Sequence, residues 1–151
     1  MTDSYGHFIA GSPIAGTSGR SGEVFNPSTG EVKANVALAS SAEVDQAVSA
    51  AKKAQQEWAT VNPQRRARVM FAFKALVERE ADALAKLLSE EHGKVIADSH
   101  GDLQRGLEVI EFACGIPHLL KGEYTEGAGP GIDVFSMRQP LGVAAGITPF
   151  N

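Results

Sequence analysis

The sequence predicts an α/β fold made of short strands and four helices. Gly, Pro and Ser punctuate residues 1–39, which indicates short strands joined by turns. From Ser40 onward, apolar residues recur with the 3.6-residue period of a helix. Residues 142–147 are small and apolar, and such a run suits a buried parallel strand.

The first part of the chain alternates strand candidates with turn residues. We expect strands over residues 7–10, 23–25, 31–33 and 35–38. Residues 11–13 read as a turn, and the glycines and serines of residues 16–22 indicate a flexible loop. In residues 26–30, Pro27 fixes φ and Gly30 permits a positive φ, so this segment predicts a strand-turn-strand unit.

Helix signals are clearest at the helix ends. Ser40 and Glu43 form a capping-box pattern, and we expect that helix to end near Thr60. The second helix begins with Asn62 as its cap and Pro63 at its first position. A third helix is terminated by Gly93. The fourth helical region covers about residues 95–120, with Gly101, Gly106 and Pro117 weakening its continuity.

Apolar side chains on these helices are expected to face a core. On the first two helices they are Val44, Ala47, Val48, Ala51, Ala54, Trp58, Val69, Phe73, Leu76 and Val77. On the other two they are Leu84, Leu87, Leu88, Leu103, Leu107, Ile110, Ala113 and Cys114.

The last part of the chain predicts two strands. Residues 122–131 are a glycine-rich connection, after which residues 132–138 alternate apolar and polar side chains. That alternation predicts a strand with one wet face, which could serve as an edge for association. Pro149 ends the buried strand that follows, and Asn151 is either an ordinary turn residue or an amide aimed outward.

Composition excludes several classes of function. The chain has 151 residues, a formal charge of −4 and a pI near 5.5, so no general affinity for nucleic acid is expected. No apolar run is long enough to span a bilayer, and the first residues lack the features of a secretory signal. The one cysteine, Cys114, fits a reducing cytoplasm. The histidines show no metal-binding spacing, so we expect no metal site.

Two segments carry candidate functional residues. Residues 91–94, Glu-His-Gly-Lys, join two helices and represent either capping chemistry or part of a site. Arg105 precedes Gly106 within a helix, where the missing side chain leaves room for a ligand. Its guanidinium could bind a carboxylate in bidentate fashion, or it could pair with Asp102 or Glu108 along the helix. Cys114 lies in an apolar stripe without an obvious base, which favours a structural thiol.

Four blocks of the sequence occur together in one known family. They are Asn-Pro-Ser-Thr-Gly-Glu at residues 26–31, Glu-His-Gly-Lys at 91–94, Gly-Asp-Leu-Gln-Arg-Gly-Leu-Glu-Val at 101–109, and the segment from Pro140 to Asn151. With these blocks the chain resembles the amino-terminal third of the aldehyde dehydrogenase superfamily. The third block and the Pro-Phe-Asn ending are most similar to CoA-acylating methylmalonate-semialdehyde dehydrogenases.

The resemblance implies a mechanism and a role for four residues. A cysteine thiolate attacks the aldehyde, a hydride passes to NAD, and CoA attacks the resulting thioester, with loss of the substrate carboxylate as carbon dioxide or bicarbonate. Asn151 would donate its side-chain N–H to the oxyanion, and Arg105 would bind the substrate carboxylate. Thr148 and Phe150 would line the nicotinamide side of the NAD site. The product would be propionyl-CoA or acetyl-CoA, and the implied pathway is valine catabolism.

The same resemblance implies an incomplete enzyme. Residues 1–151 would be an amino-terminal fragment of the NAD-binding domain, with the first strand of a Rossmann-like parallel sheet and an oligomerisation strand at about residues 132–138. The catalytic domain and its nucleophilic cysteine would be absent. We therefore expect a fragment that is inactive alone and prone to association, from an enzyme that is a homotetramer when complete. The alternatives are a hydrolytic aldehyde dehydrogenase fragment and a non-catalytic truncated binding module.

Overall fold

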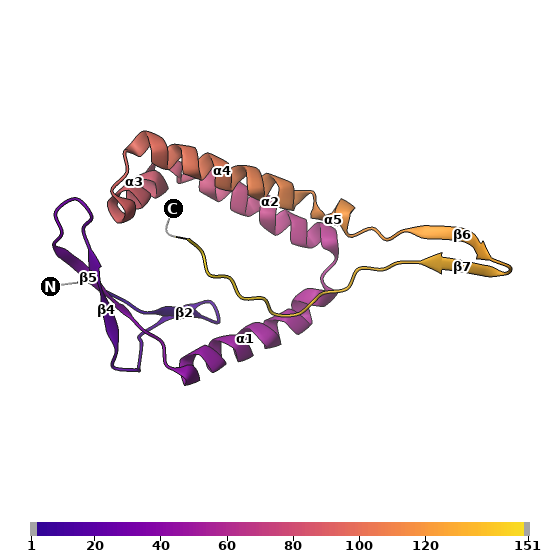
Figure 1. Cartoon of the computed structure of the whole chain (residues 1–151), viewed down its shortest axis with the longest axis horizontal. Helices are drawn as coiled ribbons and strands as arrows, with labels where there is room; N and C mark the ends of the chain where they lie inside the picture. The colour runs from indigo at the N-terminus through magenta and orange to yellow at the C-terminus, as the bar shows by residue number, and fades with distance from the viewer. Residues whose placement is uncertain (1–2, 150–151) are drawn as a thin grey trace.

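The computed structural model describes residues 3–149 and confirms the α/β class. Its strands are β1 (Asp3–Tyr5), β2 (His7–Ile9), β3 (Ser12–Ile14), β4 (Ser21–Phe25), β5 (Val32–Ala37), β6 (Tyr124–Gly129) and β7 (Ile132–Phe135). Its helices are α1 (Ser41–Thr60), α2 (Pro63–Arg79), α3 (Ala81–His92), α4 (Ile96–Cys114) and α5 (Ile116–Leu119). Figure 1 shows α2 and α4 side by side, with α1 apart from them and the β6–β7 hairpin projecting from one end.

A three-stranded sheet forms the N-terminal end of the molecule. Strand β5 is central, antiparallel to β4 and parallel to β1. The predicted strand-turn-strand over residues 23–33 is confirmed: the Asn26 side chain accepts a hydrogen bond from the Ser28 amide at 2.9 Å, and Gly30 has a φ of 75°. The two strands expected at 31–33 and 35–38 are one continuous strand. Strand β1 lies in a polar segment whose pattern does not predict it.

The turn predicted at residues 11–13 is wrong in position, because Ser12 and Pro13 belong to the β2–β3 hairpin. Ala10 and Gly11 both have positive φ, 54° and 79°, as a tight two-residue hairpin turn requires. The turn therefore lies one residue earlier, and Ser12 and Pro13 begin the return strand. A proline is tolerated there because the hairpin has only two strands, so its missing N–H has an open side to face.

The predicted start and end of α1, the predicted start of α2 and the predicted end of α3 are confirmed. Asn62 caps α2 by accepting from the Gln64 amide at 2.9 Å, and Pro63 occupies the first turn. Helix α3 ends at Gly93, whose left-handed φ of 85° closes the last turn.

The fourth helical region is two helices, so residues 3–149 contain five helices where four were predicted. The break lies at Gly115, and Pro117 sits in the first turn of α5, where its missing N–H is tolerated. Gly101 and Gly106 do not interrupt α4.

The predicted glycine-rich connection at residues 122–131 is wrong over most of its length, because Tyr124–Gly129 forms strand β6 and pairs with β7. The carboxylate of Asp133 joins the two arms: it accepts from the Tyr124 hydroxyl at 2.7 Å and from the Gly127 amide at 2.9 Å. Strand β7 is shorter than the predicted 132–138.

The buried strand predicted at residues 142–147 is not formed. Residues 136–149 have no regular secondary structure, and Leu141 and Ile147 are fully exposed. In Figure 1 this segment runs as a single extended trace with no strand beside it. A parallel strand needs a hydrogen-bonded neighbour, and the described chain supplies none.

Little apolar surface is buried in the described residues. Among residues 3–149 the buried apolar residues are Ala34, Ala67 and Ala85. The apolar stripes predicted to face a core are largely exposed; Val48, Trp58 and Phe73, for example, are each about half exposed. Helices α2, α3 and α4 pack on one another, but no second layer covers their outer faces. No helix in the described part of the chain is long and apolar enough to cross a membrane.

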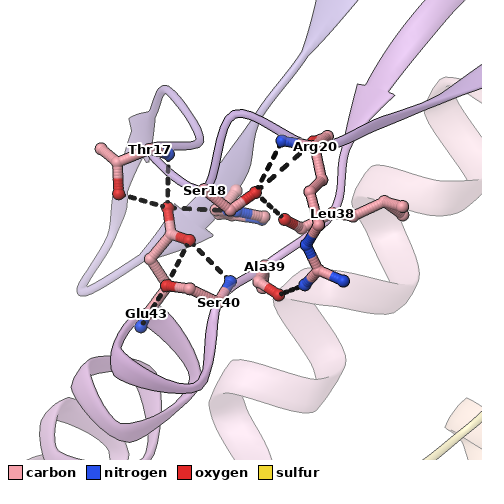
Figure 2. A network of polar contacts seen from close by, with 8 residues as sticks. Thr17, Ser18, Arg20, Leu38, Ala39, Ser40 and Glu43 are labelled. Atoms are coloured by element: carbon pink, nitrogen blue, oxygen red, sulfur yellow. Dashed lines mark hydrogen bonds and ion pairs between the residues drawn. The ribbon is translucent and has the colours of Figure 1, made fainter.

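A buried carboxylate connects the N-terminal strands to α1 (Figure 2). Glu43 is 6% exposed and accepts from the Thr17 amide at 2.6 Å, the Thr17 hydroxyl at 3.0 Å and the Ser40 amide at 2.7 Å. Ser40 in return accepts from the Glu43 amide, which completes the predicted capping box. The His7 ring nitrogen Nε2 lies 3.7 Å from the same carboxylate. The loop at residues 16–22, predicted to be flexible, is therefore tied to the helix through Thr17, and its last two residues belong to strand β4.

Replacing Ser40 with alanine removes the hydroxyl of this capping box. We expect a loss of about 1 kcal/mol in the local stability of α1, or about fivefold faster hydrogen exchange of its first-turn amides. Ser41→Ala, one residue further on at an exposed position, is the matched control. Equal exchange rates in the two variants would contradict the capping role.

The stability of the chain should also depend on the ionisation of Glu43. Hydrogen bonds from the Ser40 and Thr17 amides, and then from the Ser40 hydroxyl, lower the pKa of Glu43 from 4.5 to about 2. Because the folded-state pKa is depressed, this contribution is complete above pH 4.5 and is lost as the pH falls towards about 2.

Thermal unfolding followed by circular dichroism across that pH range checks this expectation. Glu43→Gln should reduce the loss of thermal stability at acid pH, whereas Glu57→Gln, at an exposed position on the same helix, should not. An identical acid profile for the wild type and Glu43→Gln would show that the carboxylate does not carry the effect.

Candidate functional site

The Glu-His-Gly-Lys segment packs against the Asn26–Gly30 turn, far away in sequence. Glu91 Oε1 lies 2.9 Å from Lys33 Nζ on β5. The hydrogen bond to Glu91 raises the pKa of Lys33 above its ordinary value. A Cβ placed on Gly93 would lie 3.2 Å from Pro27 Cβ, so the glycine is held closely against the turn. Gly93 thus has the capping role that was one of the two interpretations of this segment, and Glu91 forms an ion pair with Lys33. A role of the segment in a site stays a prediction.

The contacts of Glu91 with Lys33 and of Gly93 with Pro27 form a joint between the α3–α4 connection and the N-terminal strands. Lys94 connects the start of α4 to this joint. Its ammonium donates to Asp102 Oδ2 on the second turn of α4. The side chain of Lys94 is only 13% exposed, whereas that of Asp102 is 43% exposed. Sequence reasoning missed this pair, because the two residues are eight positions apart and the helix pattern does not show how the connection between α3 and α4 places Lys94.

Arg105 projects from the middle of α4. Its side chain is 81% exposed, and its Nη1 lies 3.1 Å from Glu108 Oε2, one turn further along the same helix. Of the two helix partners predicted, the structure selects Glu108, because Asp102 is engaged by Lys94. An exposed pair of this kind contributes about 0–1 kcal/mol, so a ligand carboxylate could displace Glu108 at little cost.

The surface beside Arg105 is open. A Cβ placed on Gly106 would have no heavy atom within 4 Å, and the same holds for Gly101. The room predicted next to Arg105 is therefore present in the structure. Binding of a substrate carboxylate by Arg105 stays a prediction.

The other predicted site residues fall at the end of the chain. Thr148 is exposed and lies on the irregular segment 136–149. Phe150 and Asn151 lie outside the described residues. Within residues 3–149, Arg105 pairs with Glu108, and a shared site of Arg105 and Thr148 stays a prediction.

Cys114 is a free, half-buried thiol at the last position of α4. It lines a surface hollow with Phe71, Lys74, Glu111 and Gly115. Lys74 is a cationic neighbour that the sequence pattern did not reveal, because it comes from α2. Its ammonium is already paired with Glu78 and with Glu111, the latter at 3.3 Å, which raises the pKa of Lys74. Both carboxylates compete with the thiol for that charge, which agrees with a structural role for Cys114.

Comparison with known proteins defines the class. The profile of the aldehyde dehydrogenase family matches residues 14–151. The chain belongs to the aldehyde dehydrogenase family.

Two relatives within this family are semialdehyde dehydrogenases. The chain is 48% identical to a malonate-semialdehyde dehydrogenase of Pseudomonas aeruginosa over 96% of its own length and 29% of the relative. It is 45% identical to the acylating, mitochondrial methylmalonate-semialdehyde dehydrogenase of Arabidopsis thaliana, over 96% of this chain and 24% of that protein. The chain thus spans less than a third of the length of these relatives.

Two solved structures from this family also match the chain closely. A Sinorhizobium meliloti 1021 protein, provisionally assigned as a methylmalonate-semialdehyde dehydrogenase and solved with NAD, matches with a TM-score of 0.96 and 60% identity, over all of this chain and 31% of that one. The methylmalonate-semialdehyde dehydrogenase of Oceanimonas doudoroffii matches with a TM-score of 0.94 and 52% identity, over 99% of this chain and 30% of that one.

NAD is the cofactor that this family implies. Thr148 is exposed on a segment with no paired strand, so nothing in the described chain encloses it. Contact of Thr148 with the cofactor stays a prediction.

The joint at Gly93 can be tested through its backbone. Gly93→Ala forces a side chain into a left-handed conformation against Pro27, and we expect a loss of about 1–2 kcal/mol in the free energy of unfolding. Gly101→Ala is the matched control, and a helix-interior glycine with open space should gain about 0.5–1 kcal/mol on this change. Urea unfolding of both variants measures these changes in the free energy of unfolding. A Gly93→Ala variant more stable than the wild type would contradict the close packing.

Proposed function

We propose that this chain is part of an NAD-dependent, CoA-acylating dehydrogenase that oxidises malonate or methylmalonate semialdehyde to acetyl-CoA or propionyl-CoA. The observation that carries the proposal is the guanidinium of Arg105, which is 81% exposed beside the open surface at Gly106. A semialdehyde of this kind has a carboxylate at the end opposite its aldehyde. The planar fork of an arginine binds a carboxylate through two parallel hydrogen bonds.

The relatives support both the substrate class and the cofactors. Malonate- and methylmalonate-semialdehyde dehydrogenases match 96% of this chain, and the Arabidopsis thaliana relative is described as acylating. The Sinorhizobium meliloti structure contains NAD. We infer NAD as the hydride acceptor and CoA as the acyl acceptor on these grounds.

The nucleophile is proposed to lie in the part of the family's length that this chain does not span. Cys114 is half-buried beside a lysine that two glutamates already engage, and such surroundings do not favour a reactive thiolate. In this proposal Asn151 supplies an oxyanion donor, Thr148 and Phe150 contact the cofactor, and the chain alone is inactive.

Assembly as a homotetramer is proposed for the complete enzyme. The β6–β7 hairpin projects from the helices and exposes Tyr124, Ile132, Val134 and Phe135. An exposed apolar strand is a template for pairing with another chain. The cytoplasm is the proposed compartment, which the single free cysteine supports.

Replacing Arg105 tests the proposed substrate class in a catalytically competent enzyme that contains this chain. Arg105→Leu should raise the KM for malonate semialdehyde about 10- to 100-fold, because a hydrogen-bonded charge pair contributes about 1.5–3 kcal/mol. The KM for propionaldehyde, which has no carboxylate, should stay nearly unchanged.

Arg79→Leu is the matched control, since Arg79 is also exposed, at 67%, and pairs with a neighbouring glutamate at 2.8 Å. It should affect neither substrate. Equal effects of Arg105→Leu on both aldehydes would remove Arg105 from the carboxylate site and would favour the alternative of a hydrolytic aldehyde dehydrogenase.

A further inference from the structure

Arg105 has a carboxylate one helical turn away on each side. Asp102 precedes it by three residues and Glu108 follows it by three. Side chains three residues apart lie on the same face of a helix and pair readily when their charges are opposite. A helix with this sequence would therefore let both carboxylates reach the guanidinium.

The structure divides the two carboxylates between two cations. Glu108 is paired with Arg105, whereas Asp102 accepts from Lys94. Lys94 belongs to the connection between α3 and α4, and it follows Gly93 directly. Gly93 packs on Pro27, so the backbone that carries Lys94 is held from outside its own helix.

The two ion pairs differ in how firmly they are held. The Lys94 side chain is 13% exposed, and its ammonium donates a hydrogen bond to the carboxylate of Asp102. The Arg105 side chain is 81% exposed and is free to leave Glu108. Salt and water weaken the second pair far more than the first.

We propose that Lys94 is a positioning residue that sets specificity for acidic substrates, because it holds Asp102 away from Arg105. The inference rests on the proposed function of Arg105 as the group that binds the substrate carboxylate. Without Lys94, Asp102 would oppose the substrate in two ways. It would compete for the guanidinium, and its uncompensated charge would repel the incoming carboxylate.

The test is a double-mutant cycle in a catalytically competent enzyme that contains this chain. KM and kcat are measured with malonate semialdehyde and with propionaldehyde for Lys94→Met, Asp102→Asn and the double variant. Lys94→Met should raise the KM for malonate semialdehyde about twofold to tenfold, with kcat and both constants for propionaldehyde unchanged. The double variant should return to the wild-type KM, because no carboxylate is then released.

Two controls separate this role from a general structural one. Lys94→Arg keeps the charge and should behave as the wild type. Lys86→Met removes a lysine of α3 that is 74% exposed and lies 3.9 Å from Glu90. This variant should leave KM and kcat unchanged for both substrates. If Lys94→Met does not fold, Lys94→Leu also removes both the charge and the donor to Asp102, and it is read in the same way.

The possible results distinguish the inference from the function on which it rests. A selective effect of Arg105→Leu with no effect of Lys94→Met would overturn the role of Lys94 and leave the proposed function intact. A raised KM that persists in the double variant would also overturn it, since Lys94 would then act without Asp102. An unselective Arg105→Leu would overturn the proposed function itself.

Discussion

The N-terminal half of this chain depends on one carboxylate. Glu43 is buried and accepts hydrogen bonds from Thr17 and Ser40, and it lies beside His7, so it connects a hairpin, a loop and the start of α1. In most domains a hydrophobic core holds such segments together. Here the buried apolar residues of the described chain are three alanines, and hydrogen bonds to a buried carboxylate connect these segments.

A second polar joint orients the helix that carries the candidate site. Lys33 binds Glu91, Gly93 packs on Pro27, and Lys94 binds Asp102, so strand β5, the 26–30 turn and α4 are held in one arrangement. These contacts fix the direction of α4 relative to β5 and the 26–30 turn. The exposure of Arg105 follows from that direction and from the engagement of Asp102 elsewhere.

Local signals predicted the local structure. The capping box at Ser40, the Asn62-Pro63 start and the left-handed Gly93 each specify a helix end through contacts within a few residues, and each is confirmed. Features that depend on distant partners were missed or wrong. The strand at residues 142–147 needs a neighbour that the described chain lacks, and strand β6 is stabilised by Asp133 from the opposite arm. For the candidate site, the room beside Arg105 was predictable, whereas Lys94–Asp102 and the position of Lys74 near Cys114 depend on tertiary contacts.

The central claim is that Arg105 binds a substrate carboxylate, and a crystal structure of a complete enzyme with 3-hydroxypropionate tests it most directly. This unreactive alcohol keeps the carboxylate of malonate semialdehyde. We expect both carboxylate oxygens within about 2.7–3.2 Å of the Arg105 guanidinium, with Glu108 displaced and Asp102 still paired with Lys94. A carboxylate bound by another cation, with Arg105 still paired with Glu108, would contradict it.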